Sequence, residues 1–598
     1  MSSNKYLLVI AILLQVSITS PVMASLAGSY NVGNGQTFTT ITDALKSWKD
    51  STITGNVTFR LMDATYPSET FPLVCTIPAA YSGGNWNLTI KPISRCSIIG
   101  NNATTILYVK SINRLTIDGG ASDTTKDLVI YNSSTASGPS TISLINGASY
   151  NTIKNCIIKG QGNFGHTLRI YTSATGSASG NNNNLIENCD ITRGQDTVLY
   201  NSVYVTASSS SYQNMNNTIR HCNIYNFYMS GVTVGSYSPN TTITECNIYS
   251  TTPQLSSYMY GIYSFGSGQG LIATRNRIGG FMPYYPGGTS SQLGMYLTAT
   301  LTTDTNTIAN NFIYLNSTVS PDNNNIYGIG VGAPVNTNYN IFYNSIYLAG
   351  TATSGLSAGI ARNRANLNIK NNIVFNNRTG GSGATYCIYD STGVGSWTSD
   401  YNDLYMPTPG SNSQYVSYRN GTNFDSLVNW QIATGFDSNS ISLNPEFVST
   451  TDLHINPLSS NVNNLGTPIS GITIDYDDDT RDSLTPDIGA DEYTPGAGCE
   501  EPKTKGSIIN LENIYPNPFK KQAMIKYHLS QSSPVRLKIY NCLGSEVRTL
   551  IDQNQTSGSY SIIWDGKDDN GLRVPNGIYV CNIKTANKVQ CSKLMLIK

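Results

Sequence analysis

The stretch Ile153-Lys-Asn-Cys156-Ile-Ile158 returns in altered form along most of the chain. A typical copy has an apolar residue, two others, Cys or Asn, one other, and a closing apolar residue. The Cys or Asn positions lie 24 to 35 residues apart and are Cys156, Cys189, Cys222, Cys246, Asn276, Asn311, Asn344, Asn372 and Asn402. A motif that recurs at this spacing indicates a solenoid, because one repeat cannot bury its own apolar face and must stack on the next.

The motif also indicates the kind of solenoid. Its apolar residues alternate with period 2, and a second triplet such as Leu168-Arg-Ile170 precedes most copies. This period is typical of strands, and no helical period is present. We therefore predict an all-β chain built on a parallel β-helix. The Cys or Asn should point inward at a bend between two strands, because Asn tolerates left-handed backbone and can bond to its copy in the next coil.

These features resemble a known family. The motif, its spacing and the run Leu115-Thr-Ile-Asp-Gly-Gly120 are similar to the right-handed parallel β-helix of the pectin-lyase-like superfamily. The resemblance covers about residues 30–490 and implies that fold. It implies no single function, because the fold carries lyases, hydrolases, tail-spike proteins, adhesins and inert stalks.

The N-terminal region is predicted to have two parts before the β-helix at 55–406. Residues 1–24 have the pattern of an export signal, with Lys5, a short apolar core and small residues at the cleavage site. The core is shorter than the ~20 residues of a membrane-spanning helix, so no transmembrane anchor is expected. Residues 25–54 should form a cap whose short helix begins near Thr40 and covers the open end of the solenoid.

Residues 407–495 lose the repeat and are predicted to form an irregular C-terminal cap. Within it, Asp475, Asp477 and Asp479 alternate as at the start of a calcium loop. Thr480 and Pro486 stand where such a loop has Gly and its closing Glu. The alternative is a structural turn, for which the family resemblance implies an arrangement of Asp475 with Arg481.

Residues 496–508 read as a linker, and the composition changes beyond them. Three phrases, Tyr515-Pro-Asn-Pro-Phe519, Trp564-Asp-Gly and Gly577-Ile-Tyr579, resemble the C-terminal sorting domain of type IX secretion and the Ig-like domain of flagellar hook-capping proteins. The resemblance implies that 509–598 is an Ig-like sandwich and an address for an outer-membrane export machinery. The expected location is then secreted, or the outer-membrane surface of a Gram-negative-type bacterium. The alternative is a plain sandwich domain.

Charge and cysteine content restrict the partners. The chain has 36 basic and 36 acidic residues, so nothing favours nucleic acid or an anionic membrane. Its 11 Cys are odd in number and cannot all pair. The four stacked Cys are predicted to be free thiols rather than disulfides, because parallel side chains seldom meet the torsional requirement of a disulfide. A zinc site is disfavoured, because no CxxC pair occurs.

The resemblance to the pectin-lyase-like superfamily implies that catalytic residues would lie on the sheet face that its enzymes use as a groove. The predicted outward positions are Ser143, Arg169, Tyr204, Thr233, Tyr263, Tyr296, Gly330, Ala361 and Tyr389. None is a carboxylate, whereas a glycoside hydrolase needs a pair of acids. The remaining catalytic candidates are Lys159, His166, Arg169, Arg193 and Asp196. Solvated polar residues on turns are the alternative for all five.

The outward positions are instead rich in aromatic rings. The predicted ligand-binding residues are Arg169, Tyr204, Tyr263, Tyr296 and Tyr389, and the loops add Phe227, Tyr228, Tyr258, Tyr260, Phe281, Tyr284, Tyr285 and Tyr327. Rigid rings among small polar residues favour sugar binding, although Tyr also simply fits strands. We predict a protein that binds a polysaccharide or cell-surface glycan, or is an adhesin or structural stalk, with no cofactor unless calcium binds. The alternative is a polysaccharide lyase or glycoside hydrolase with a non-standard site.

Overall fold

The computed structural model describes residues 24–123, 125–172, 179–194, 200–254, 256–267, 270–283, 290–300, 305–317, 325–351, 354–379, 382–410, 413–456, 461–493, 509–529, 531–541, 545–585 and 589–597. The chain forms two compact units, of which the first ends at Glu492 and the second begins at Tyr493. Among the described residues, no helix has the length and apolarity needed to cross a membrane.

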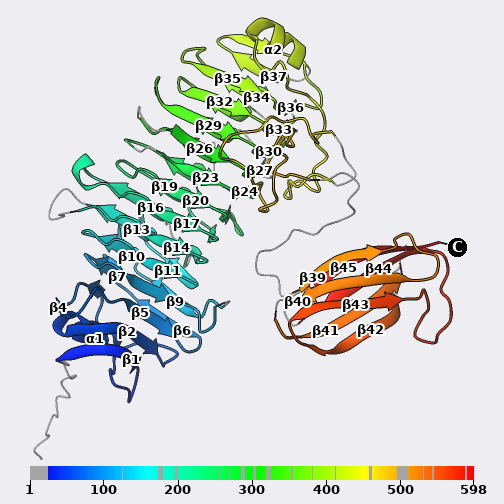
Figure 1. Ribbon diagram of the computed structural model, residues 1–598. Coiled ribbons are helices and arrows are strands. Elements are labelled where there is room, and N and C mark those ends of the chain that lie inside the picture. Colours follow the sequence, from blue (N-terminus) through cyan, green and yellow to red (C-terminus); the bar gives the residue numbers. More distant parts are fainter. Residues whose placement is uncertain are drawn as a thin grey trace, which may run out of the picture. The chain divides into compact units, whose positions relative to one another are not determined.

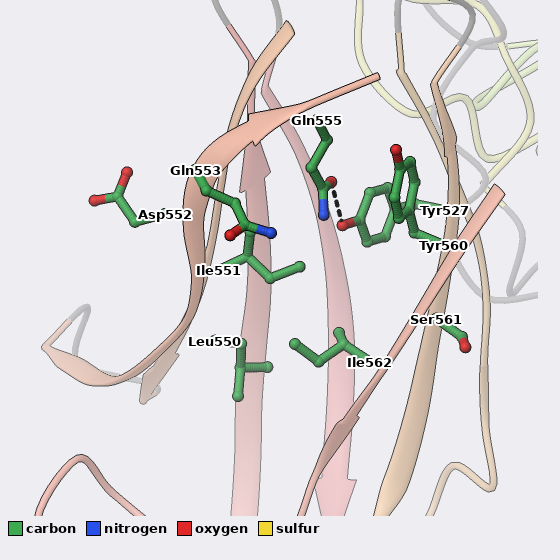
Figure 2. A pocket seen from close by; sticks show the side chains of 9 residues that line it. All are labelled: Tyr527, Leu550, Ile551, Asp552, Gln553, Gln555, Tyr560, Ser561 and Ile562. Carbon is green, nitrogen blue, oxygen red and sulfur yellow. Dashed lines mark hydrogen bonds between the residues drawn. The ribbon is translucent and has the colours of Figure 1, made fainter. Parts of the chain in front are cut away.

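The first unit is a right-handed parallel β-helix with three sheets (Figure 1). Sheet 1 consists of β1 (Ser25–Val32), β2 (Thr52–Leu61), β5 (Leu88–Pro92), β8 (Leu115–Asp118), β11 (Thr152–Lys154), β14 (Leu185–Glu187), β17 (Thr218–Arg220), β20 (Thr242–Thr244), β23 (Ile272–Thr274), β26 (Thr305–Ala309), β29 (Asn338–Phe342), β32 (Asn366–Lys370) and β35 (Trp397–Asp400), with β4 (Ala80–Tyr81) beside β2.

The other two sheets follow sheet 1 in each coil. Sheet 2 consists of β6 (Cys96–Gly100), β9 (Leu128–Asn132), β12 (Cys156–Gly160), β15 (Asp190–Arg193), β18 (Asn223–Tyr225), β21 (Asn247–Tyr249), β24 (Arg277–Gly279), β27 (Phe312–Ser317), β30 (Ser345–Gly350), β33 (Ile373–Asn376) and β36 (Asp403–Tyr405). Sheet 3 consists of β3 (Leu73–Thr76), β7 (Thr105–Lys110), β10 (Ser140–Ile145), β13 (His166–Thr172), β16 (Asn201–Ala207), β19 (Ser230–Val234), β22 (Tyr258–Ser264), β25 (Ser291–Leu297), β28 (Ile326–Val331), β31 (Ser357–Arg362), β34 (Thr385–Asp390), β37 (Gln414–Arg419) and β38 (Thr422–Phe424). A 3₁₀ turn, η1 (Ser210–Tyr212), precedes β17.

The predicted file of Cys and Asn side chains is confirmed at the turn between sheets 1 and 2. Asn311 shows the repeating pattern, because its backbone N–H and Nδ2 both donate to Oδ1 of Asn344, at 3.2 and 2.8 Å. Asn276, Asn344 and Asn372 make the same pair of bonds to the next copy. The four Cys continue the file as free, buried thiols. The amide ladder thus satisfies polar groups that would be costly to bury unpaired.

The left-handed residue of this turn is not the one predicted. The residue before each ladder position has positive φ, as in Asn155 (55°), His221 (53°) and Tyr343 (52°), whereas the ladder residues themselves do not. Asn is therefore selected at the ladder for hydrogen bonding and not for its tolerance of left-handed backbone.

A second ladder of Asn side chains lies directly before the strands of sheet 1. It was not predicted from the sequence. The amide of Asn151 donates to Oδ1 of Asn184, and the amide of Asn184 donates to Oδ1 of Asn217, at 3.1 and 3.0 Å. Each of these Asn residues lies two positions before the first apolar residue of the motif. That constant offset was the available signal.

Both ends of the solenoid are covered. Helix α1 (Ile41–Asp50) begins at Thr40, whose side chain accepts from the N–H of Asp43, and it buries Ile41, Leu45 and Trp48 as expected. At the other end, helix α2 (Leu427–Thr434) brings in Trp430, whose Nε1 donates to Oδ2 of Asp437 at 2.8 Å. Oδ1 of Asp437 accepts from Nδ2 of Asn402, so the ladder ends on a fully buried carboxylate.

The coil boundaries differ from the predicted 55–406. Parallel pairing begins with β1 against β2 and continues to β37 against β34. Beyond α2 the chain returns along the solenoid instead of only capping its end (Figure 1). Nδ2 of Asn371 and the hydroxyl of Tyr343 both donate to the carbonyl of Thr467, at 2.7 and 2.8 Å.

The second unit is a small antiparallel sandwich, as predicted. One sheet has the order β39 (Ile509–Tyr515), β40 (Ala523–Leu529), β43 (Gly558–Trp564), and the other has β42 (Glu546–Gln555), β41 (Ser533–Asn541), β44 (Gly577–Lys584), β45 (Val589–Leu596). Buried residues such as Tyr527, Leu537 and Trp564 fill the space between the sheets.

The ladder leads to a stability prediction. Asn344→Ala should lower the free energy of unfolding by about 2–4 kcal/mol, because it leaves the buried donors of Asn311 unpaired. Asn316→Ala, at an exposed position on β27, is the control and should change it by less than about 0.5 kcal/mol. Urea unfolding followed by circular dichroism compares the two. Equal effects of the two substitutions would show that the ladder contributes no special stability.

Candidate functional site

Sheet 3 carries a row of side chains in register on the side away from the core, although Ser143 and Thr233 of this row are covered by their neighbours and buried. The paired positions run Tyr108, Ser143, Arg169, Tyr204, Thr233, Tyr263, Tyr296, Gly330, Ala361, Tyr389 and Tyr418. The nine predicted positions all belong to it, and the structure adds one Tyr at each end. We call these eleven residues the outer row. It contains no Asp or Glu.

A second row, the inner row, lies three residues earlier on the same strands and was not predicted. Its paired members are His166, Asn201, Ser230, Tyr260, Leu293, Tyr327, Ala358, Tyr386 and Tyr415. Glycines follow it in five successive coils, at 231, 261, 294, 328 and 359. A Cβ on Gly261 would lie 2.4 Å from Cγ2 of Ile278 in the core. The recurring Gly therefore faces the core directly before another inward residue, which breaks the simple alternation of the strand.

The Tyr rings of the two rows stack on one another. Centroids of Tyr263 and Tyr296 are 5.7 Å apart with planes 11° apart, and Tyr260 and Tyr296 are 5.4 Å apart. Tyr389 and Tyr418 form a second stack at 4.7 Å. The stacking follows from the coil spacing of about 4.8 Å. Because neighbours cover much of each ring face, these stacks are half-buried and rigid.

Freely exposed rings lie beside them, at the start of the sheet 3 strands. Phe164 is 59% exposed and Tyr258 is 52% exposed. The prediction that Phe227 and Phe281 lie in surface loops is wrong. Both rings are buried and pack edge to face, with centroids 5.5 Å apart. The predicted Tyr284 and Tyr285 lie outside the described residues.

The predicted catalytic cluster is only partly brought together. His166 and Arg169 share β13 of sheet 3. Lys159 lies on β12 and Arg193 on β15, both in sheet 2. Asp196 lies outside the described residues. Of the described catalytic candidates, only His166 and Arg169 therefore belong to the two rows.

His166 is held by a hydrogen-bond network of the inner row. Oδ1 of Asn201 accepts from the hydroxyls of Ser230 and Thr233, at 2.7 and 3.0 Å, so its Nδ2 faces Nδ1 of His166 at 3.3 Å as a donor. This network assigns the remaining ring proton to Nε2. Burial, and then the charge of Arg169, lower the pKa of His166 to about 3. The imidazole is thus neutral at physiological pH, where it acts as a weak base.

The predicted calcium candidates divide into a turn and a cluster. Oδ1 of Asp475 accepts from the N–H groups of Asp477 and Asp479, at 2.9 and 2.8 Å, and its Oδ2 accepts from the N–H of Glu492. These bonds fit the structural turn. Arg481 pairs with Glu492 at 3.1 Å, and not with Asp475 as the resemblance implied.

His454 and Asp491 join Asp477 in a group that the sequence did not reveal. Ligand atoms of these three lie within 4.8 Å of one another, close enough to hold a metal ion. Nε2 of His454 bonds to Asp477 at 2.7 Å, and its Nδ1 bonds to Asp452. Burial opposes the charge of His454, but these two carboxylates outweigh it and raise its pKa to about 10. An imidazolium therefore offsets part of the negative charge of these carboxylates.

Comparison with known proteins identifies the second unit. Residues 518–588 match the FlgD Ig-like domain. No curated protein sequence is significantly similar to the chain.

Solved structures share the architecture at low identity. The A-module of mannuronan C-5 epimerase AlgE4 from Azotobacter vinelandii is 12% identical over 60% of this chain and 91% of that chain, with a TM-score of 0.32. Pectate lyase Pel9A is 12% identical over 73% and 88%, with a TM-score of 0.30. Dimeric latent PorU from Porphyromonas gingivalis is 16% identical over 18% of this chain and only 10% of its own length, with a TM-score of 0.14. At these scores the likenesses carry no argument about function.

The charge of His454 leads to a pH prediction. Its pKa rises from about 6.5 unfolded to about 10 folded, so its stabilisation is complete below pH 6.5 and is lost as pH rises toward 10. His454→Gln should therefore destabilise the protein at pH 7.5, with a difference from wild type that shrinks by at most about 1.4 kcal/mol per pH unit toward pH 10. Thermal unfolding of both proteins from pH 7.5 to 10 measures it.

The pH range from 7.5 to 10 avoids most of the titration of two neighbouring carboxyl groups. Burial raises the pKa of Asp475 to about 7 and that of Asp491 to about 6, and both titrate mostly below pH 7.5. A wild-type advantage that stays constant across the window would contradict a charged His454.

Proposed function

We propose that the protein is a secreted or surface-displayed, non-catalytic β-helix that binds a polysaccharide through the outer and inner rows of sheet 3. The observation that carries this proposal is the composition of the rows, which hold two groups of stacked Tyr rings with their hydroxyl groups and no carboxylate. Rings supply apolar contact to sugar faces, and hydroxyl groups supply hydrogen bonds. Paired acids for glycoside hydrolysis are absent from both rows.

The rigid stacks also support binding. A ring already fixed by its neighbours loses little conformational freedom when a ligand arrives, so less of the contact energy is offset. Ring contacts recur over several coils, which suits an extended chain of sugars rather than a compact ligand.

The exposed rings provide the first binding test. Phe164→Ala together with Tyr258→Ala should weaken polysaccharide binding about tenfold or more, because each exposed ring contributes up to roughly 1–2 kcal/mol of contact. Neither ring is buried, so thermal stability should stay unchanged. Affinity electrophoresis against a panel of neutral and acidic polysaccharides measures the effect.

Tyr150→Asn is the matched control. Tyr150 is 63% exposed but lies before the ladder of sheet 1, and Asn tolerates its positive φ. Equal binding by the double variant and this control would contradict the proposed surface. Release of unsaturated, ultraviolet-absorbing sugars or of new reducing ends would support a lyase or a hydrolase instead.

We also propose that the second unit directs export across the outer membrane. Its match to an Ig-like domain, and its separation from the β-helix as a compact unit, support this role. Deletion of 493–598 should leave the β-helix folded but retain it in the periplasm, as measured by cell fractionation and protease accessibility. Surface display of the truncated protein at wild-type level would contradict it.

A further inference from the structure

Arg169 is the only charged residue of the outer row. Several other arginines of the first unit have carboxylate partners, such as Arg220 with Glu187 at 2.6 Å and Arg362 with Asp390 at 2.8 Å. Arg169 forms no ion pair with any described residue, and its buried Nε–H has no hydrogen-bond acceptor. A half-buried guanidinium left without an acceptor needs an explanation, because such groups are normally paired.

Aromatic rings surround this guanidinium. Its Cζ lies 5.2 Å from the ring centroid of Tyr171, and Tyr108 and Tyr204 are near enough to act on its charge. Rings stabilise a cation and fix its position, but they leave its N–H groups unsatisfied. The rings therefore hold the cation in place, while its buried Nε–H remains without a hydrogen-bond partner.

His166 adds a second available donor. Its ring lies against Tyr204 at 4.3 Å, with planes 10° apart. Since Asn201 occupies Nδ1, the Nε2–H has no described acceptor, and the ring carries no charge that would demand a counter-ion of its own. Arg169 and His166 lie three residues apart on β13, one in each row. Donors of both rows thus gather at one coil, and no carboxylate among the described residues pairs with them.

We propose that Arg169 and His166 form a subsite for the carboxylate of a uronic acid unit within the polysaccharide that the rows bind. A planar carboxylate can accept two parallel N–H bonds from a guanidinium and a further bond from the imidazole. The subsite rests on the proposed function, because the rings of neighbouring coils would hold the adjoining sugars. It requires no metal ion.

Matched oligosaccharides test the subsite separately from the stacking surface. Oligogalacturonate and its methyl ester have the same rings and differ in charge. Calorimetry at low salt should show wild type binding the acid about tenfold more tightly than the ester, as expected for one charge-assisted contact. Arg169→Gln should abolish this preference, so that the variant binds the acid and the ester equally. His166→Gln should reduce the preference by a smaller factor.

Arg169→Lys and Arg60→Gln complete the set. Lys keeps the positive charge but cannot donate two parallel N–H bonds to a carboxylate, so Arg169→Lys should retain only part of the preference. Arg60 is exposed on sheet 1, and its replacement should have no effect. Unchanged thermal unfolding of each variant shows that the fold is intact. Equal binding of acid and ester by wild type, or a preference that survives Arg169→Gln, would overturn the subsite alone. Failure of wild type to bind either oligomer would count against the proposed function itself.

Discussion

The fold depends on one constraint, which is that every buried amide at the turn between sheets 1 and 2 must find its copy in the next coil. Asn276, Asn311, Asn344 and Asn372 each donate twice to the following residue of the file, and Asp437 receives the last bond. A coil displaced by one residue would leave these donors without acceptors in a region that water does not reach. The ladder therefore fixes the register of each coil. Because sheet 3 belongs to the same coils, the ladder also aligns the outer row, although the two lie on different parts of the solenoid.

This coupling explains why sequence alone was informative about the fold. The spacing of Cys156 to Asn402 was sufficient to predict the coils, the inward file and the nine outward positions, because a solenoid contacts mainly its nearest repeats. Errors arose where that locality fails. At Gly261 and its copies two successive residues face the core, so strict alternation did not predict the inner row. The pair of Arg481 with Glu492 and that of His454 with Asp477 belong to a returning segment without periodicity, and no repeat indicates which residues it meets.

The distribution of charge separates the faces of the solenoid. At the turn between sheets 1 and 2, cations and carboxylates alternate and neutralise one another, as with Arg220 and Glu187 or Arg275 and Glu245. At the end of sheet 3, Arg362 and Arg419 share Asp390. The outer row between these regions has rings, hydroxyl groups and one cation without a partner. Paired charges are already satisfied and offer little to a ligand, so the ring-bearing face is where ligand chemistry remains available.

A stacked arrangement of rings has a consequence for selectivity. Rings that contact each other across coils give an even, weakly discriminating surface along the solenoid, because each coil presents a similar edge and hydroxyl group. Discrimination must then come from positions where the pattern is interrupted. Arg169 and His166 interrupt it at one coil with donors. Gly330 and Ala361 interrupt the outer row at two others, because Gly has no side chain and Ala has only a methyl group. A repeating scaffold can in this way combine general affinity for an extended ligand with recognition at a few coils, without any change in the ladder that holds the coils together.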